Sequence, residues 1–161
     1  MTAPFVAPRI IAVAAAVILG AALVACTPTA APSTPTPTNT ESTVHAFQPV
    51  YDAVAASDPR VERVSSVSVS QSGAARQLTV VIRVTGDEPV TTDTLVAVLT
   101  AIRDSAGGSA DMLQLIARDA DDPDRLLDLE PAIAGVPSGV SALRIDGALV
   151  VPFDDLNQLG G

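Results

Sequence analysis

The chain has 161 residues, of which 48% are hydrophobic and 2% aromatic, and its formal net charge is −9 at pH 7. It contains no lysine and no tryptophan, which argues against Walker-type phosphate loops, Ser-x-x-Lys acyl transfer and lysine Schiff bases. An acidic chain with so few aromatic residues also lacks the basic patches and stacking platforms that nucleic acids require, so no nucleic-acid partner is expected.

The N-terminal segment from Ile10 to Ala25 is an uninterrupted apolar run of 16 residues that follows Arg9. A charged start followed by a short apolar run predicts an export signal. A transmembrane helix needs about 20 apolar residues, so an uncleaved membrane anchor fits less well. Cleavage to a free secreted protein also fits less well, because ordinary signal cleavage prefers a small residue where Leu23 stands.

The apolar run ends in Leu23-Val24-Ala25-Cys26, and Cys26 is the only cysteine in the chain. These four residues resemble the lipobox of bacterial lipoproteins. The resemblance implies that Leu23, Val24 and Ala25 are recognised by a signal peptidase, which cuts before Cys26. It further implies a diacylglyceryl group on Cys26 that holds the chain on the extracytoplasmic face of the cell membrane. Two acyl chains provide stable anchoring, whereas one provides only marginal binding.

Charge does not assist this anchoring. All 18 acidic residues follow Cys26, as do 8 of the 9 arginines, so the side chains after the predicted cleavage carry 8 − 18 = −10. Anionic lipid repels such a surface, and we therefore expect the lipid group to be the membrane contact.

The segment over 26–43 begins with the lipidated cysteine and is rich in threonine and proline. Thr27 to Thr43 contains seven threonines, four prolines and two serines in 17 positions. This composition predicts a semi-rigid tether that extends by about 3.1 Å per residue, or roughly 50 Å. A plain linker is favoured over an O-glycosylated stalk, for which composition is the only indication.

The remaining residues, 44–161, are enough for one folded domain. Hydrophobic spacing and turn residues predict its elements in chain order. These are a helix over 47–54, strands over 60–70 and 77–84, a helix capped by Thr91 or Thr92 and ended by Gly107-Gly108, a strand over 111–118 buried on both faces, a helix over 124–134, a hairpin whose strands contain 143–145 and 149–151, and a final turn capped by Asp154.

This order predicts an α+β two-layer sandwich: a mostly antiparallel sheet of four to five strands with helices packed on it. Its α-β-β-α-β portion resembles a ferredoxin-like unit that lacks the first strand. The terminal hairpin around Asp146-Gly147 could replace that strand. Fold likeness of this kind carries little functional weight.

The acidic run over 119–124 is the main candidate for a cation site. Asp119, Asp121 and Glu130 match positions 1, 3 and 12 of a calcium loop. However, Pro123 and Asp124 occupy positions that require a ligand and a glycine. We therefore interpret Asp122 as the cap of the helix over 124–134, with Pro123 in its first position, and expect no metal site.

Two further residues, His45 and Ser109, are of types that could act in catalysis. His45 is the only histidine, too few for an imidazole metal site, and is expected to be exposed and without a role. Ser109 follows Gly107-Gly108, but it lacks the second glycine of a nucleophile elbow and comes after a helix rather than a strand. No catalytic residue and no cofactor are predicted.

The sequence therefore predicts a lipid-anchored domain that serves as a non-catalytic protein-binding or accessory module of the cell envelope, with another envelope protein as its partner. The alternative is a small-ligand or cation-binding domain associated with a transporter, although about 118 residues is short for solute capture.

Overall fold

The computed structural model describes residues 46–160. The predicted lipobox, the tether and His45 lie outside these residues. The described elements are α2 (Gln48–Ala55), β1 (Val61–Ser72), β2 (Ala75–Val84), α3 (Thr92–Ser105), β3 (Met112–Asp119), α4 (Glu130–Ile133), β4 (Leu143–Ile145), β5 (Ala148–Pro152) and the 3-10 helix η1 (Phe153–Gln158).

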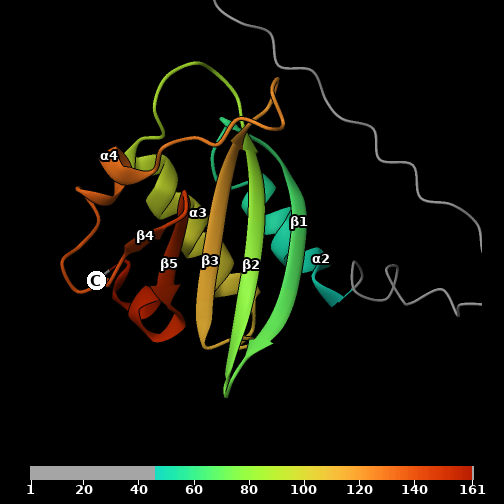
Figure 1. Ribbon diagram of the computed structural model, residues 1–161, viewed down its shortest axis with the longest axis vertical. Coiled ribbons are helices and arrows are strands. Elements are labelled where there is room, and N and C mark those ends of the chain that lie inside the picture. Colours follow the sequence, from blue (N-terminus) through green and yellow to red (C-terminus); the bar gives the residue numbers. More distant parts are fainter. Residues whose placement is uncertain (1–45, 161) are drawn as a thin grey trace, which may run out of the picture. The chain divides into compact units, whose positions relative to one another are not determined.

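The five strands form one mixed sheet in the order β1-β2-β3-β5-β4, and the helices pack on one of its faces (Figure 1). Three of the four strand pairs are antiparallel, while β2 and β3 run parallel and are connected through α3. The predicted α+β two-layer sandwich is confirmed. Within residues 46–160 no helix covers the other side of the sheet, which we call the open face.

The terminal hairpin does not take the position suggested by the ferredoxin-like comparison. That comparison requires a strand between β2 and β3, but these two strands pair directly from Gln77 with Met112 to Val84 with Asp119. The hairpin instead adds β5 to the far edge of β3, which leaves β4 at the edge of the sheet. This detail of the prediction is wrong because parallel pairing through α3 leaves no gap to fill.

The core lies between the sheet and the helices. Every second side chain of β2 faces it, and α3 presents one apolar stripe toward it. The largest of these buried side chains are Leu78, Ile82, Leu95, Leu99 and Ile102. Thr91 begins α3 by accepting a hydrogen bond from the Thr94 amide at 3.2 Å, as one of the two predicted caps.

Strand β3 differs from its prediction because only one of its faces is fully buried. Leu113 and Leu115 are completely buried against the helices, whereas Met112 and Ile116 on the open face are only partly buried. The adjacent apolar pairs in its sequence reflect one core-facing residue and one residue on an uncovered, partly apolar surface.

The helix predicted over 124–134 is also wrong in most of its length. Only Glu130–Ile133 is helical, because residues 125–127 extend beside the end of β3. The amide of Asp119 donates to the carbonyl of Arg125 at 3.0 Å, and the amide of Leu127 donates to the carbonyl of Ala117 at 2.9 Å. These sheet-type hydrogen bonds replace the first turns of the expected helix.

Both predicted hairpins are confirmed, and the second turns at Asp146-Gly147. Asp146 has φ 51° and Gly147 has φ 81°, the left-handed conformations that a two-residue hairpin turn requires. The following turn carries the buried Leu156 as expected, but Pro152 rather than Asp154 precedes its first residue, and no side chain caps it.

Candidate functional site

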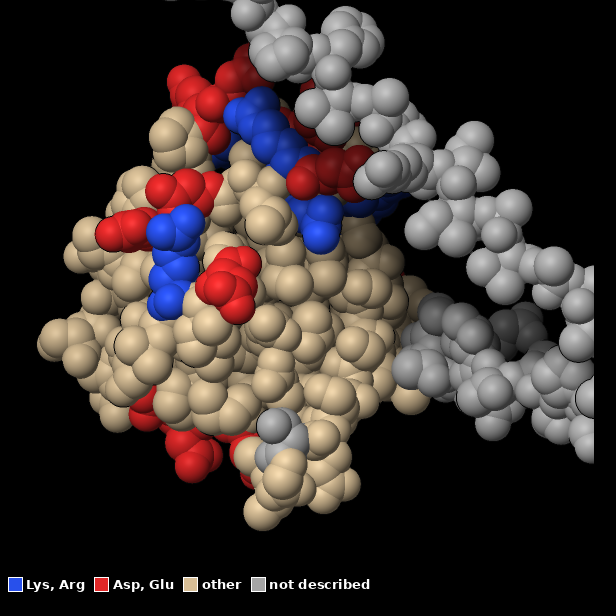
Figure 2. Space-filling view, in the orientation of Figure 1, with Lys and Arg blue, Asp and Glu red and all other residues tan. Residues whose placement is uncertain are grey.

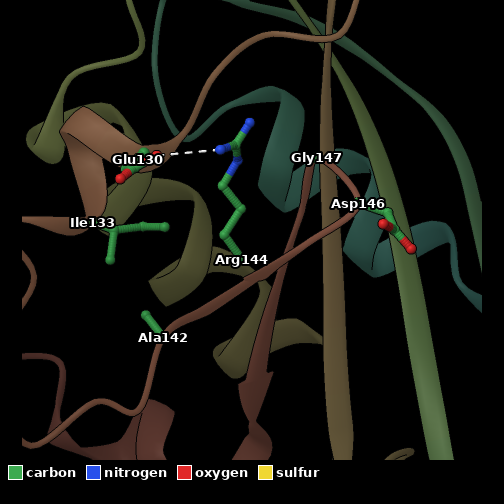
Figure 3. Close-up of a pocket in the computed structure, with 6 residues that line it drawn as sticks. All are labelled: Glu130, Ile133, Ala142, Arg144, Asp146 and Gly147. Atoms are coloured by element: carbon green, nitrogen blue, oxygen red, sulfur yellow. Dashed lines mark hydrogen bonds and ion pairs between the residues drawn. The ribbon is translucent and has the colours of Figure 1, made fainter.

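A groove lies between α4 and the β4–β5 hairpin (Figure 3). Its volume is about 570 Å³, and it opens widely to solvent. It is lined by Glu130, Ile133, Ala142, Arg144, Asp146 and Gly147. The volume would accommodate a small molecule, so the groove is the place where a bound ligand would be sought.

Two charged groups of this groove, Arg144 and Glu130, are already paired, whereas Asp146 at its other side makes no ion pair with a described residue. Arg144 extends from β4 between two carboxylates, with its Nε 3.5 Å from Asp128 and a terminal nitrogen 3.2 Å from Glu130. All three side chains are substantially exposed, so these ion pairs are weak. A ligand at Arg144 would have to displace one of these contacts in water, which makes this side of the groove a poor anion site.

The acidic run over 119–124 forms a self-contained turn. The Oδ1 atom of Asp119 accepts the amides of Asp121 at 2.8 Å and Asp122 at 3.0 Å, and its Oδ2 lies 3.4 Å from Arg125. The backbone amides of Asp122 and then Asp121, helped by the nearby Arg125 and Arg83, hold the pKa of Asp119 below its ordinary value. Its carboxylate therefore stabilises the turn.

The other candidate residues do not converge. Asp122 accepts the amide of Asp124 at 3.2 Å and so closes a turn, instead of capping a helix. Glu130 belongs to the Arg144 cluster and not to a loop with Asp119. Within residues 46–160, no group of three or more acidic, histidine or cysteine side chains is arranged to hold a metal ion.

Ser109 lies in the loop between α3 and β3. Its Oγ is buried and has no hydrogen-bond partner among the described residues. Gly107 and Gly108, which precede Ser109 and gave it a partial likeness to a nucleophile elbow, have left-handed backbone conformations and form a sharp turn. Because His45 and the lipobox residues Leu23, Val24, Ala25 and Cys26 lie outside the described residues, the structure places none of them relative to this serine.

The open face is the second candidate site, and it is a surface rather than a cavity. At its centre Gln114 accepts hydrogen bonds from Gln77 at 2.7 Å and from Thr79 at 3.2 Å. Val81 and Ile116 lie beside this polar cluster and remain partly exposed. Figure 2 shows charged side chains at the end where β2 and β3 finish and along the side of β4, and a single acidic side chain near the centre of the visible face.

Apolar exposure continues toward the outer hairpin. Leu143 pairs with Val150 and Ile145 with Ala148, and both β4 side chains are more than half exposed, at 61% and 51%. Leu126, 44% exposed, forms a bridge with Arg118 and extends this apolar margin. The alternation in β2 predicts a polar outer face, but only the strand order shows that the outer residues of all five strands form one surface.

No helix in the described part of the chain is long and apolar enough to cross a membrane. Comparison of the chain with protein-family models, curated proteins and solved structures gave no match.

Proposed function

We propose that this protein is a lipid-anchored extracytoplasmic lipoprotein whose domain is a non-catalytic protein-binding or accessory module of the cell envelope. Leu23-Val24-Ala25-Cys26 supports the anchor, since the lipobox resemblance accounts for both Leu23 and the lone cysteine. The proposed localisation is the outer face of the cell membrane.

The open face is the observation that supports the binding role. It is a broad sheet surface with polar and partly apolar side chains along its strands, arginines at one end, and Leu143 and Ile145 exposed at its margin. Exposed apolar surface of this kind, rimmed by polar residues, is typical of protein–protein contact sites. The groove between α4 and the hairpin supports a ligand-binding role less well, because it is widely open to solvent and its arginine is already paired with two carboxylates.

The anchor is tested by changing Cys26→Ala in the full chain expressed in a bacterium that processes lipoproteins. We expect labelling by a radioactive fatty acid to disappear and the precursor to remain uncut. Thr27→Ala, one residue further along, is the matched control and should still be labelled. Normal cleavage of the Cys26→Ala protein would contradict the lipobox interpretation.

The binding role is tested by crosslinking the native lipidated protein in cells and identifying the captured proteins by mass spectrometry. One dominant envelope protein, recovered reciprocally when that protein is used as bait, is the expected result. Failure to recover a reciprocal partner in any growth condition would count against the proposal.

The alternative of a small-ligand or cation-binding domain is favoured only by the volume of the Arg144 groove. Thermal unfolding in the presence of calcium or a panel of metabolites separates the two. A specific rise of several degrees that is lost in Arg144→Gln would favour the ligand-binding role.

A further inference from the structure

Three arginines lie side by side across the end of the open face. In the strand register Arg63 of β1 is paired with Arg83 of β2, and Arg83 is paired with Arg118 of β3. Side chains at paired positions of neighbouring strands lie on the same face of the sheet. These residues therefore form one transverse line, which we call the arginine row.

Among the described residues the arginine row, like Arg60, lacks the ion pairs that the four other arginines make. Arg76, Arg103, Arg125 and Arg144 each lie within 4 Å of a carboxylate. Within residues 46–160, no carboxylate is that close to any member of the row. Like charges at directly opposite positions destabilise a sheet. Among the described carboxylates, Asp119 is influenced by the charge of Arg83, which helps to lower its pKa, although the two groups form no ion pair.

Neutral oxygens hold two of the three guanidinium groups in place. Arg83 donates to the Ser65 hydroxyl at 2.9 Å and to the Asp119 carbonyl at 3.1 Å, and Arg118 donates to the Pro123 carbonyl at 2.7 Å. These contacts orient the groups without cancelling their charge. The Asp119 carboxylate is directed to its own turn and to Arg125.

We propose that the arginine row is the carboxylate-binding end of the open face, and that its partner is a protein segment with acidic residues beside apolar ones. This inference rests on the proposed protein-binding function and specifies the chemistry of the partner. Guanidinium groups bind carboxylates through paired, charge-assisted hydrogen bonds. The partner's apolar side chains would contact Val81 and Ile116, which adjoin the row on β2 and β3.

The surrounding charge favours such a segment over a polyanion. The whole chain has a net charge of −9, and acidic side chains gather at the same end of this face (Figure 2). Repulsion therefore opposes nucleic acid or an anionic bilayer, which bind through extended positive fields. A few carboxylates placed directly on the arginine row would instead form short-range, charge-assisted hydrogen bonds with its guanidinium groups.

The test places a photo-crosslinking amino acid in the full lipidated chain in cells, at Val81 on the open face or at Asp93, an exposed control position on α3. We expect crosslinks from position 81 to one protein, at a peptide with acidic and apolar residues. Arg63→Glu should lower this yield about tenfold, because a charge at the edge of a contact affects capture strongly. Arg76→Glu makes the same charge change elsewhere and should leave the yield unchanged.

The variants are suited to this comparison because both arginines are exposed, and the Arg63 side chain makes no ion pair with another described residue. Unchanged melting temperatures establish that the fold is intact. Equal yields from the two variants, a crosslinked peptide without acidic residues, or capture only of lipid or of a second copy of this chain would overturn the inference. Capture only from position 93 would overturn it and leave the binding role standing, whereas no captured protein at either position would count against both.

Discussion

The hydroxyl of Tyr51 accepts a hydrogen bond from the backbone amide of Val67 at 2.9 Å. Tyr51 belongs to α2, and Val67 lies on β1, which among the strands of residues 46–160 pairs with β2 alone and is therefore an edge strand of the described sheet. Unpaired edge amides invite pairing with other chains. One helix side chain thus occupies a backbone donor at the exposed edge of the sheet, where β1 is also interrupted by two irregularities in register.

Tyr51→Phe is expected to lower the free energy of unfolding by about 1 kcal/mol, because the ring is kept and one partly buried hydrogen bond is lost. Hydrogen exchange of the Val67 amide should become faster. Urea unfolding and amide exchange measure the two effects, with Tyr51→Leu as a control that also loses the ring packing. Unchanged exchange at Val67 would show that the hydroxyl does not protect this edge.

The open face predicts unequal consequences for two neighbouring residues of β3. Leu115 is fully buried against the helices, while Ile116 is partly exposed on the open face. Leu115→Ala should therefore cost about 2–5 kcal/mol in unfolding free energy, and Ile116→Ala about 1 kcal/mol or less. Equal losses in urea unfolding would mean that the open face is covered in the isolated protein.

The lowered pKa of Asp119 predicts that the folded domain loses stability in acid. Its pKa is held below the ordinary value of 3.8 by the amides of Asp122 and Asp121. The ionised Asp119 stabilises the folded domain fully at pH values where the same residue is also ionised in the unfolded chain. This stabilisation is lost as the pH falls below about 4 toward the lower pKa that Asp119 has in the folded state. Asp119→Asn keeps an oxygen acceptor but removes the charge, so its stability should vary less with pH in this range. Asp121→Asn is the control and should retain the acid dependence of the original protein.

The contact between α3 and α4 predicts a steric effect at Gly135. The Thr92 hydroxyl donates to the Ala132 carbonyl at 3.0 Å, and a Cβ at Gly135 would overlap the Thr92 side chain. Gly135→Ala should destabilise the domain by about 1–3 kcal/mol.

The matching double variant separates this overlap from a general cost of the substitution. In a Thr92→Ala background the same change at Gly135 should cost much less, because the overlapping atoms are gone. Equal costs in both backgrounds, measured by urea unfolding, would contradict the steric explanation.

The described helices and strands with a clear period could be predicted from sequence. Leu78, Val80, Ile82 and Val84 alternate along β2, and α3 repeats its apolar residues at helical spacing between a threonine cap and two glycines. The Asp146-Gly147 turn was equally clear, because left-handed backbone is required at both positions. Local conformational preference and burial on one face agree in these segments.

The segment after β3 could not be predicted in the same way. Asp122-Pro123-Asp124 has the residues of a helix start, yet 125–127 is extended because the end of β3 offers unpaired backbone groups next to it. A tertiary hydrogen-bonding partner there outweighs a local preference for helix. The spacing of residues in the sequence does not show which strand edge has unpaired backbone groups.

The sequence by itself determined the acidic charge, the lone cysteine in its lipobox-like setting, and the periodic elements of an α+β domain. Only the tertiary structure decided that β2 and β3 pair directly, that all helices share one side, and that Arg63, Arg83 and Arg118 become neighbours. The physical reason is that periodicity specifies which side of a strand is buried, whereas strand order and register bring distant residues onto one surface.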